Sequence, residues 1–247
     1  MLIKLNKVCY SDNECKSFFR FIILFFVIAV LIIKPLLADS LNDNFDSWLN
    51  SFKKVALKKG ISQETIDTTF KNVKFLDQVI KYDRKQPEFY EDTITYVGKR
   101  ANDARAKKAK KLLKENLNLF NEVEKKFNVE KEILLALWGI ETNFGKHVGK
   151  MDIISSLATL SFDTRRRDFF SLQLLTLLKL VDKKLLDPSN LYGSWAGAYG
   201  NFQFMPSTID KYAIDYDNNN KIELKLSIKD SLASAANYIN KIGWKKG

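Results

Sequence analysis

A continuous apolar run near the N-terminus divides this chain into two parts. All thirteen residues from 21 to 33 are apolar, and four basic residues and two acidic ones precede them. A basic start, a short apolar centre and the small residue Ala38 before a polar stretch are typical of an export signal. Because a membrane-spanning helix needs about 20 apolar residues, residues 1–38 are expected to form a cleaved signal peptide, with an uncleaved anchor as the alternative. Residues 39–247 are then one exported domain.

The exported part has to fold without disulfide bonds, since Cys9 and Cys15 both lie in the leader. His147 is the single histidine of the chain, which excludes a multi-histidine metal site and disfavours triad chemistry. Carboxylates, hydroxyls and amides therefore remain as the groups that could carry catalysis.

Basic residues outnumber acidic ones, 40 to 29, for a formal net charge of +11. Without residues 1–38 the counts are 35 and 27, so +8 belongs to the exported part. A basic balance favours a polyanionic partner such as nucleic acid, a membrane surface or an acidic polymer. Export argues against nucleic acid, because exported proteins rarely meet it.

Apolar spacing predicts a mainly α-helical fold. Residues 42–72 read as two short helices around Gly60, with Ser62 capping the second. Asn128 is expected to cap a helix whose centre is apolar on all sides, which predicts a buried core helix. Alternating strand patterns are few, and no βαβ rhythm is evident. The longer helices are expected over residues 99–126, 129–140, 172–180 and 230–242.

Glu141 follows the apolar helix directly and precedes a turn that contains Phe144. Such a carboxyl group is expected to be largely desolvated, which raises its pKa and suits a general acid. The plain alternative is a helix-end glutamate paired with one of the many lysines.

Residues 193–207 (GSWAGAYGNFQFMPS) alternate small residues with aromatic rings and amides. Glycine permits close backbone approach, as the floor of a cleft requires. Aromatic faces can stack on sugar rings, and Ser194, Asn201 and Gln203 can hydrogen-bond hydroxyl or acetamide groups. The alternative is a structural loop packed by its own aromatic residues.

Residues 215–223 (DYDNNNKIE) place oxygen side chains at positions one, three, five and nine, as in an EF-hand calcium loop. Position six is Asn220 instead of glycine, and position twelve is Leu226 instead of an acidic ligand. A polar loop that binds no metal is the alternative.

Together these segments resemble the lytic murein transglycosylase B family over roughly residues 70–247. Their order and spacing carry the resemblance. The matching segments are 83–89 (DRKQPEF), 136–145 (ALWGIETNFG), 157–160 (LATL), 165–167 (RRR), 193–207, the Asp-rich loop and 234–238 (SAANY).

The resemblance implies a lysozyme-like helical catalytic domain with an EF-hand-like loop, located in the periplasm. It implies cleavage of the β-1,4 bond between N-acetylmuramic acid and N-acetylglucosamine in peptidoglycan, with a 1,6-anhydromuramyl product and no required cofactor. Glu141 takes the position of the catalytic acid/base, and Ser194 that of the hydroxyl that orients it. Expected substrate-binding residues are Gln203, Tyr238, Asn201 and Phe202; expected ligands of a weakly bound, structural Ca²⁺ are Asp215, Asp217, Asn219 and the Lys221 carbonyl.

Three alternatives stay open at this point: a hydrolytic muramidase, a non-catalytic peptidoglycan-binding protein and, more distantly, a nucleic-acid-binding module. The expected partners are peptidoglycan strands, and the membrane if the leader is uncleaved. Since family members continue beyond the position of Gly247, residues 39–247 are expected to be a catalytic domain cut short at its C-terminus.

Overall fold

The computed structural model describes residues 44–85 and 92–247. The expected signal or anchor at residues 1–38 lies outside these residues. Residues 49–247 form one compact unit, and the few described residues before it belong to another. Within the described residues, none of the helices combines the length and apolar character needed to cross a membrane.

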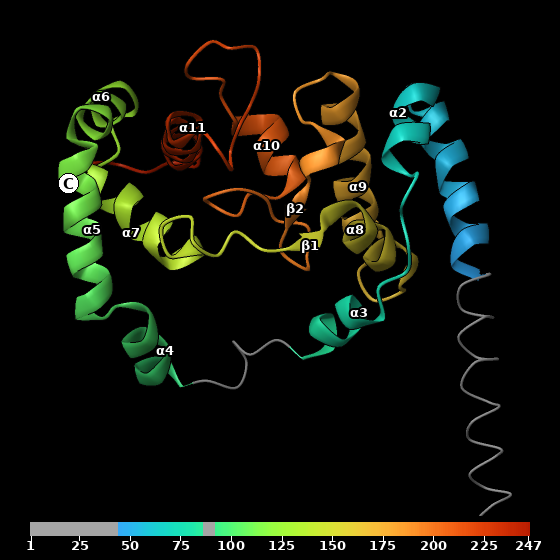
Figure 1. Cartoon of the computed structure of the whole chain (residues 1–247), viewed down its shortest axis with the longest axis horizontal. Coiled ribbons are helices and arrows are strands. Elements are labelled where there is room, and N and C mark those ends of the chain that lie inside the picture. Colours follow the sequence, from blue (N-terminus) through green and yellow to red (C-terminus); the bar gives the residue numbers. More distant parts are fainter. Residues whose placement is uncertain (1–43, 86–91) are drawn as a thin grey trace, which may run out of the picture. The chain divides into compact units, whose positions relative to one another are not determined.

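Helices dominate the unit, which confirms the expected mainly α fold (Figure 1). A helix over residues 44–58 comes first. The helices that follow are α2 (Gln63–Thr69), α3 (Asp77–Arg84), α4 (Thr93–Arg100), α5 (Asp103–Glu115), α6 (Leu117–Phe127), α7 (Lys131–Thr142), α8 (Ile153–Phe162), α9 (Arg167–Asp182), the short 3₁₀ helix η2 (Pro188–Asn190), α10 (Pro206–Tyr212) and α11 (Ile228–Lys241).

A two-stranded antiparallel ribbon lies between α7 and the loop that follows η2. Strand β1 (Met151–Asp152) pairs with β2 (Tyr192–Gly193), with Met151 opposite Gly193. The ribbon is short, but it joins the segment after α7 to the start of the Gly- and aromatic-rich loop. Two regions of the chain about 40 residues apart are thereby held side by side.

Helix α8 forms the centre of the core, since nearly all of its residues are buried. It packs against α9, and α9 in turn contacts α2 and α10. Helix α11 lies against α6 and α7 and also against α10. It therefore connects the group of α5, α6 and α7 with the group of α8, α9 and α10 (Figure 1). Tight packing of this kind stabilises the described part of the chain, which contains no cysteine.

Helix boundaries agree with the sequence at some places and differ at others. Ser62 caps α2 by accepting a hydrogen bond from the Thr65 amide (3.2 Å), as expected. Helix α9 contains the whole expected 172–180 region, and α11 contains the expected 230–242 region except for Ile242, which caps its C-terminus.

The single amphipathic helix expected over residues 99–126 is wrong, because α4, α5 and α6 share this region. The Asn102 side chain accepts a hydrogen bond from the Arg105 amide (3.0 Å) and starts α5. The Asn116 side chain donates to the Leu112 carbonyl (3.0 Å) where α5 ends. Short polar side chains compete for backbone groups in this way, and the apolar spacing alone does not reveal the breaks.

Asn128 was expected to cap the N-terminus of the next helix, and this is also wrong. It ends α6 in the left-handed conformation (φ 54°), and α7 begins at Lys131. Asparagine tolerates this conformation better than most residues, which suits it to either helix end. Helix α7 is buried on one side only, since Ala136 and Ile140 are exposed.

Candidate active site

Glu141 lies in the last turn of α7, next to a strained reversal of the chain. Asn143, Phe144 and Gly145 all have positive φ (52°, 60° and 79°). Such conformations cost about 1 kcal/mol or more for residues other than glycine and persist only where the surroundings enforce them. The Thr142 hydroxyl enforces this one by accepting a hydrogen bond from the Gly145 amide (3.0 Å). The chain therefore turns sharply just beyond Glu141.

The Glu141 side chain is exposed, which differs from the expected deep burial. Protein atoms nevertheless surround it closely enough that desolvation raises the pKa of its carboxyl group. Within the described residues, Glu141 forms no hydrogen bond or ion pair, so the alternative of a lysine-paired helix end finds no support there. An accessible carboxyl group with a raised pKa and no cationic partner has the properties of a general acid.

Asn201 holds the end of α7 in place from the opposite loop. Its Oδ1 accepts a hydrogen bond from Trp138 Nε1 (3.0 Å), and its carbonyl accepts one from the Thr142 hydroxyl (2.8 Å). Its Nδ2 lies 3.1 Å from both the Leu224 carbonyl and Ser231 Oγ. Asn201 is 5% exposed, so its side chain holds the α7 end, and its contact with substrate stays a prediction. It is a positioning residue for the α7 end.

Ser194 opens a tight turn immediately after β2. Its amide donates to the Ala198 carbonyl and its Oγ accepts from the Ala198 amide, both at 2.9 Å. A Cβ on Gly193 would lie 2.1 Å from the Ala198 carbonyl oxygen, so only glycine fits before this turn. The Ser194 hydroxyl therefore closes its own turn, and its orientation of Glu141 stays a prediction.

Gln203 links this loop to the segment after Glu141. Its Nε2 donates to the carbonyls of Val148 (3.2 Å) and Gly200 (2.9 Å), and its own φ is 49°. The bond to Val148 keeps the loop beside the 143–150 segment that follows α7. Gln203 is partly exposed, so contact of its side chain with a sugar stays a prediction.

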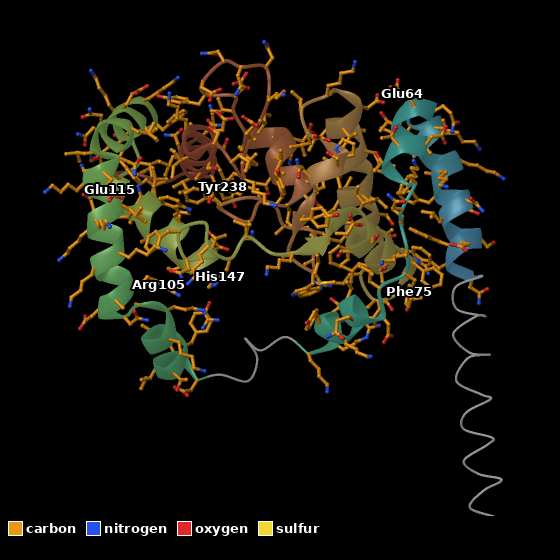
Figure 2. All side chains as sticks on the ribbon, viewed as in Figure 1. Glu64, Phe75, Arg105, Glu115, His147 and Tyr238 are labelled. Carbon is orange, nitrogen blue, oxygen red and sulfur yellow. The ribbon has the colours of Figure 1, made fainter. Side chains whose placement is uncertain are left out.

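Phe202 and Tyr238 differ in their access to solvent. Phe202 is buried and packs near Phe204, with ring centroids 6.4 Å apart, so it supports the loop, and its contact with substrate stays a prediction. Tyr238 on α11 is half-buried and contacts Phe204 and Tyr212 edge to face. Figure 2 labels Tyr238 on α11 and His147 on the segment after α7.

Two of the expected metal ligands lie in a cluster of three carboxylates. Asp215 and Asp217 offer oxygen atoms within 4.8 Å of one another and of an oxygen of Asp230. Asp230 is fully buried, and its carboxylate accepts hydrogen bonds from the amides of Tyr216 (2.9 Å) and Glu223 (3.0 Å). Burial raises its pKa, and the neighbouring Asp217 and Asp215 add to the rise.

This donor set fits a hard divalent cation, since Ca²⁺ prefers carboxylate and carbonyl oxygens. A cation would also relieve the repulsion among three close carboxylates. The side chain of Asn219, another expected ligand, is held within the loop, and the Lys221 carbonyl stays a predicted ligand. The Asn219 side chain accepts a hydrogen bond from the Lys221 amide (2.9 Å) and donates to Glu223 (3.3 Å).

Asp230 was missed because it lies beyond the twelve-residue loop, at its sixteenth position. The signal that could have found it is the Ser227 cap, whose Oγ accepts from the Asp230 amide (3.2 Å). That cap places Asp230 in the first turn of α11, next to the end of the loop. Acidic residues are common in the first turn of a helix, because they interact favourably with the helix dipole. The position of Asp230 alone therefore did not suggest a metal ligand.

Residues 44–247 match the family model described as the Transglycosylase SLT domain, and the chain belongs to this family. The expected family resemblance is thereby confirmed.

Three relatives illustrate the similarity. The membrane-bound lytic murein transglycosylase B of Escherichia coli (strain K12) is 43% identical over 122 residues, which are 49% of this chain and 34% of the relative. SltB3 from Pseudomonas aeruginosa in complex with NAG-NAM-pentapeptide superposes with a TM-score of 0.79 and 36% identity, over 82% of this chain and 54% of that one. The E. coli lytic transglycosylase Slt35 in complex with calcium superposes with a TM-score of 0.70 and 32% identity. This match covers 83% of this chain and 65% of that one.

These matches also confirm the expected lysozyme-like fold. The chain spans about a third of the curated relative and between half and two thirds of the two solved chains.

Proposed function

We propose that this protein is a lytic murein transglycosylase, which cleaves the β-1,4 bond between N-acetylmuramic acid and N-acetylglucosamine in peptidoglycan. One observation carries the proposal: Glu141 combines solvent access, a raised pKa and the absence of a described ionic partner at the end of α7. Membership of the transglycosylase family and the relatives' printed names support the same reaction.

In the proposed mechanism Glu141 first donates its proton to the glycosidic oxygen while the muramyl carbon gains positive charge. The substrate's own acetamide oxygen stabilises that carbon in place of the second carboxylate of ordinary glycosidases. The ionised Glu141 then removes the proton from the 6-hydroxyl of the same sugar. The hydroxyl oxygen bonds to the anomeric carbon and closes a 1,6-anhydro ring, favoured by its high effective concentration.

Gln203 and Tyr238 are proposed to contact the sugars, and Ser194 to orient Glu141. Asn201 and Phe202 support the loop from behind, as their burial indicates. Asp215, Asp217 and Asp230 are proposed to hold a structural Ca²⁺, a role supported by their mutual approach and by the calcium complex of the E. coli relative. The ion takes no part in the reaction.

The protein is proposed to act in the cell envelope, with residues 1–38 as signal or anchor and residues 39–247 as the catalytic domain. The basic start and short apolar run of the leader support export. The printed name of the E. coli relative, a membrane-bound enzyme, is consistent with this location.

Digestion of purified sacculi tests the reaction. The wild-type protein is expected to release anhydromuropeptides, and Glu141→Gln to lower the rate by about 100-fold or more, as loss of a general acid does. Glu132→Gln, an exposed position on the same helix, is the matched control and should retain full activity. Products heavier by one water would make the protein a muramidase, and equal inactivity of wild type and variant would make it a non-catalytic binding protein.

A further inference from the structure

The basic helix α5 carries five lysines, and one of them differs from the others in what it contacts. Lys108 is half-buried, and its Nζ donates a hydrogen bond to the carbonyl of Asn143 (3.0 Å), two residues after Glu141. We propose that Lys108 is a positioning residue, which fixes the end of α7 and thereby the Glu141 carboxyl group; the proposal rests on the function proposed above. The remaining lysines of α5 are exposed: Lys107, Lys110, Lys111 and Lys114.

The hydrogen bond from Lys108 satisfies a carbonyl group at the end of a helix, where carbonyl groups lack amide partners one turn ahead. Two backbone bonds already close this turn. The Asn143 amide donates to the Gly139 carbonyl (3.1 Å), and the next amide, that of Phe144, donates to Trp138 (3.1 Å). Lys108 supplies a donor for the Asn143 carbonyl from another helix, and its positive charge suits the negative end of the helix dipole.

The same ammonium group lies over the ring of Phe144. Its Nζ is 5.0 Å from the ring centroid, which is within the range of a cation–π interaction. The ring is buried and also packs edge to face on Trp138, with centroids 5.7 Å apart. A Cβ on Gly139 would lie 2.8 Å from this ring, so the ring fits closely against α7. Lys108 therefore restrains both the backbone and an aromatic side chain of the reversal after Glu141.

This restraint matters because the reversal has a costly conformation. Asn143 and Phe144 both have positive φ, which such residues keep only where contacts enforce it. The Thr142 hydroxyl acts from within the turn, whereas Lys108 acts from α5, which packs against α7 (Figure 1). A general acid has to lie within hydrogen-bond reach of the glycosidic oxygen, and a displacement on the order of 1 Å is enough to lower the rate. Loss of the Lys108 contact is expected to displace Glu141 in this way.

Steady-state kinetics on murein strands test this role. Lys108→Met keeps a long apolar stem but loses the donor and the charge. Its kcat should fall about 10- to 100-fold, the effect of a misplaced catalytic group. KM should change little, because the Lys108 ammonium group contacts protein groups. Lys108→Arg should recover most of kcat, since a guanidinium group also donates hydrogen bonds and stacks on aromatic faces. Lys107→Met, at the exposed neighbouring position, is the matched control and should keep the wild-type kcat.

Amide hydrogen exchange separates this role from the proposed activity, because it requires no turnover. In Lys108→Met the amides of residues 143–147 should exchange about tenfold faster than in the wild-type protein, since the contact that holds the turn closed is lost. The amides of α9 should keep their rates, and Lys107→Met should exchange like the wild-type protein throughout. Faster exchange confined to residues 143–147 supports the positioning contact even if the wild-type protein cleaves no murein.

Two results would overturn the proposal while leaving the transglycosylase reaction intact. One is a Lys108→Met protein with wild-type kcat or wild-type exchange at residues 143–147. The other is a rise in KM with an unchanged kcat, which would make Lys108 a contact for substrate. Melting temperatures of all variants above the assay temperature serve as the folding control.

Discussion

At the scale of single residues, the setting of Glu141 determines how the reaction should depend on pH. Desolvation favours the neutral carboxyl group and raises its pKa above the ordinary value of 4.5. The neutral form is the one that donates a proton. The acid form therefore persists to higher pH than it would for a free glutamate.

We expect kcat/KM to fall on the alkaline side, as the pH rises through the raised pKa of Glu141. Measuring kcat/KM across a pH series on soluble glycan strands checks this, with Glu132→Gln expected to keep the profile unchanged. Since the folded pKa is raised, ionised Glu141 also destabilises the fold above pH 4.5, so Glu141→Gln should unfold at a slightly higher temperature at neutral pH. A decline centred below pH 4.5 would contradict the assignment.

Replacing Asn201 should disturb the end of α7 that carries Glu141, because Asn201 hydrogen-bonds to Trp138 and Thr142 of this helix. Asn201→Ala removes the acceptor for Trp138 Nε1 and leaves that buried donor unpaired. The expected loss is about 1–3 kcal/mol in the free energy of unfolding, together with reduced kcat. Urea unfolding measures the loss, and Asn118→Ala on exposed α6 surface should change stability by less than about 0.5 kcal/mol. Equal stability of both variants would contradict the assigned role.

At the scale of elements, the ribbon and the turn after it depend on Gly193. A Cβ there would lie 2.1 Å from the Ala198 carbonyl oxygen and 2.7 Å from an Ile153 methyl group. Gly193→Ala should therefore separate β2 from its turn and cost about 3 kcal/mol, the upper end for overpacking. Thermal unfolding measures this cost.

Gly98 in α4 offers the matched glycine control. A Cβ at that position meets nothing within 4 Å, and its φ is not positive. Gly98→Ala should stabilise the protein by up to about 1 kcal/mol through helix propensity. If Gly193→Ala behaved in the same way, the close approach of the ribbon to its turn would be wrong.

The prediction of elements from sequence succeeded where one local pattern dominated. Ser62 starts α2 because its hydroxyl competes for a backbone amide within three residues. The break between α5 and α6 was missed because asparagine at Asn116 is compatible with a helix interior, a cap or a turn. Asn128 was assigned to the wrong helix end for the same reason.

At the scale of the whole molecule, calcium should raise stability by holding the Asp-rich loop against the start of α11. Binding to Asp215, Asp217 and Asp230 would join the Asp-rich loop to α11, which packs on α6 and α7. A Ca²⁺ concentration 100 times the Kd should raise the melting temperature by about 5–10 °C. Calorimetry with and without a chelator measures the shift.

Two matched variants distinguish a rise in melting temperature caused by Ca²⁺ bound at this site from one caused by general screening of charge. Asp217→Asn removes an exposed carboxylate of the cluster and should abolish most of the shift. Asp103→Asn, an exposed carboxylate in the first turn of α5, should preserve it. The same rise in all three proteins would contradict the site.

The sequence by itself determined the helical class, the position of Glu141 after an apolar helix and the family resemblance, because these depend on local spacing and ordered motifs. Only the tertiary structure decided that Asn201 is buried, that Asp230 joins the carboxylate cluster and that Lys108 reaches the Asn143 carbonyl. Each of these depends on residues many positions apart in the chain. Packing brings such residues together, and no local pattern of charge or hydrophobicity records which of them will meet.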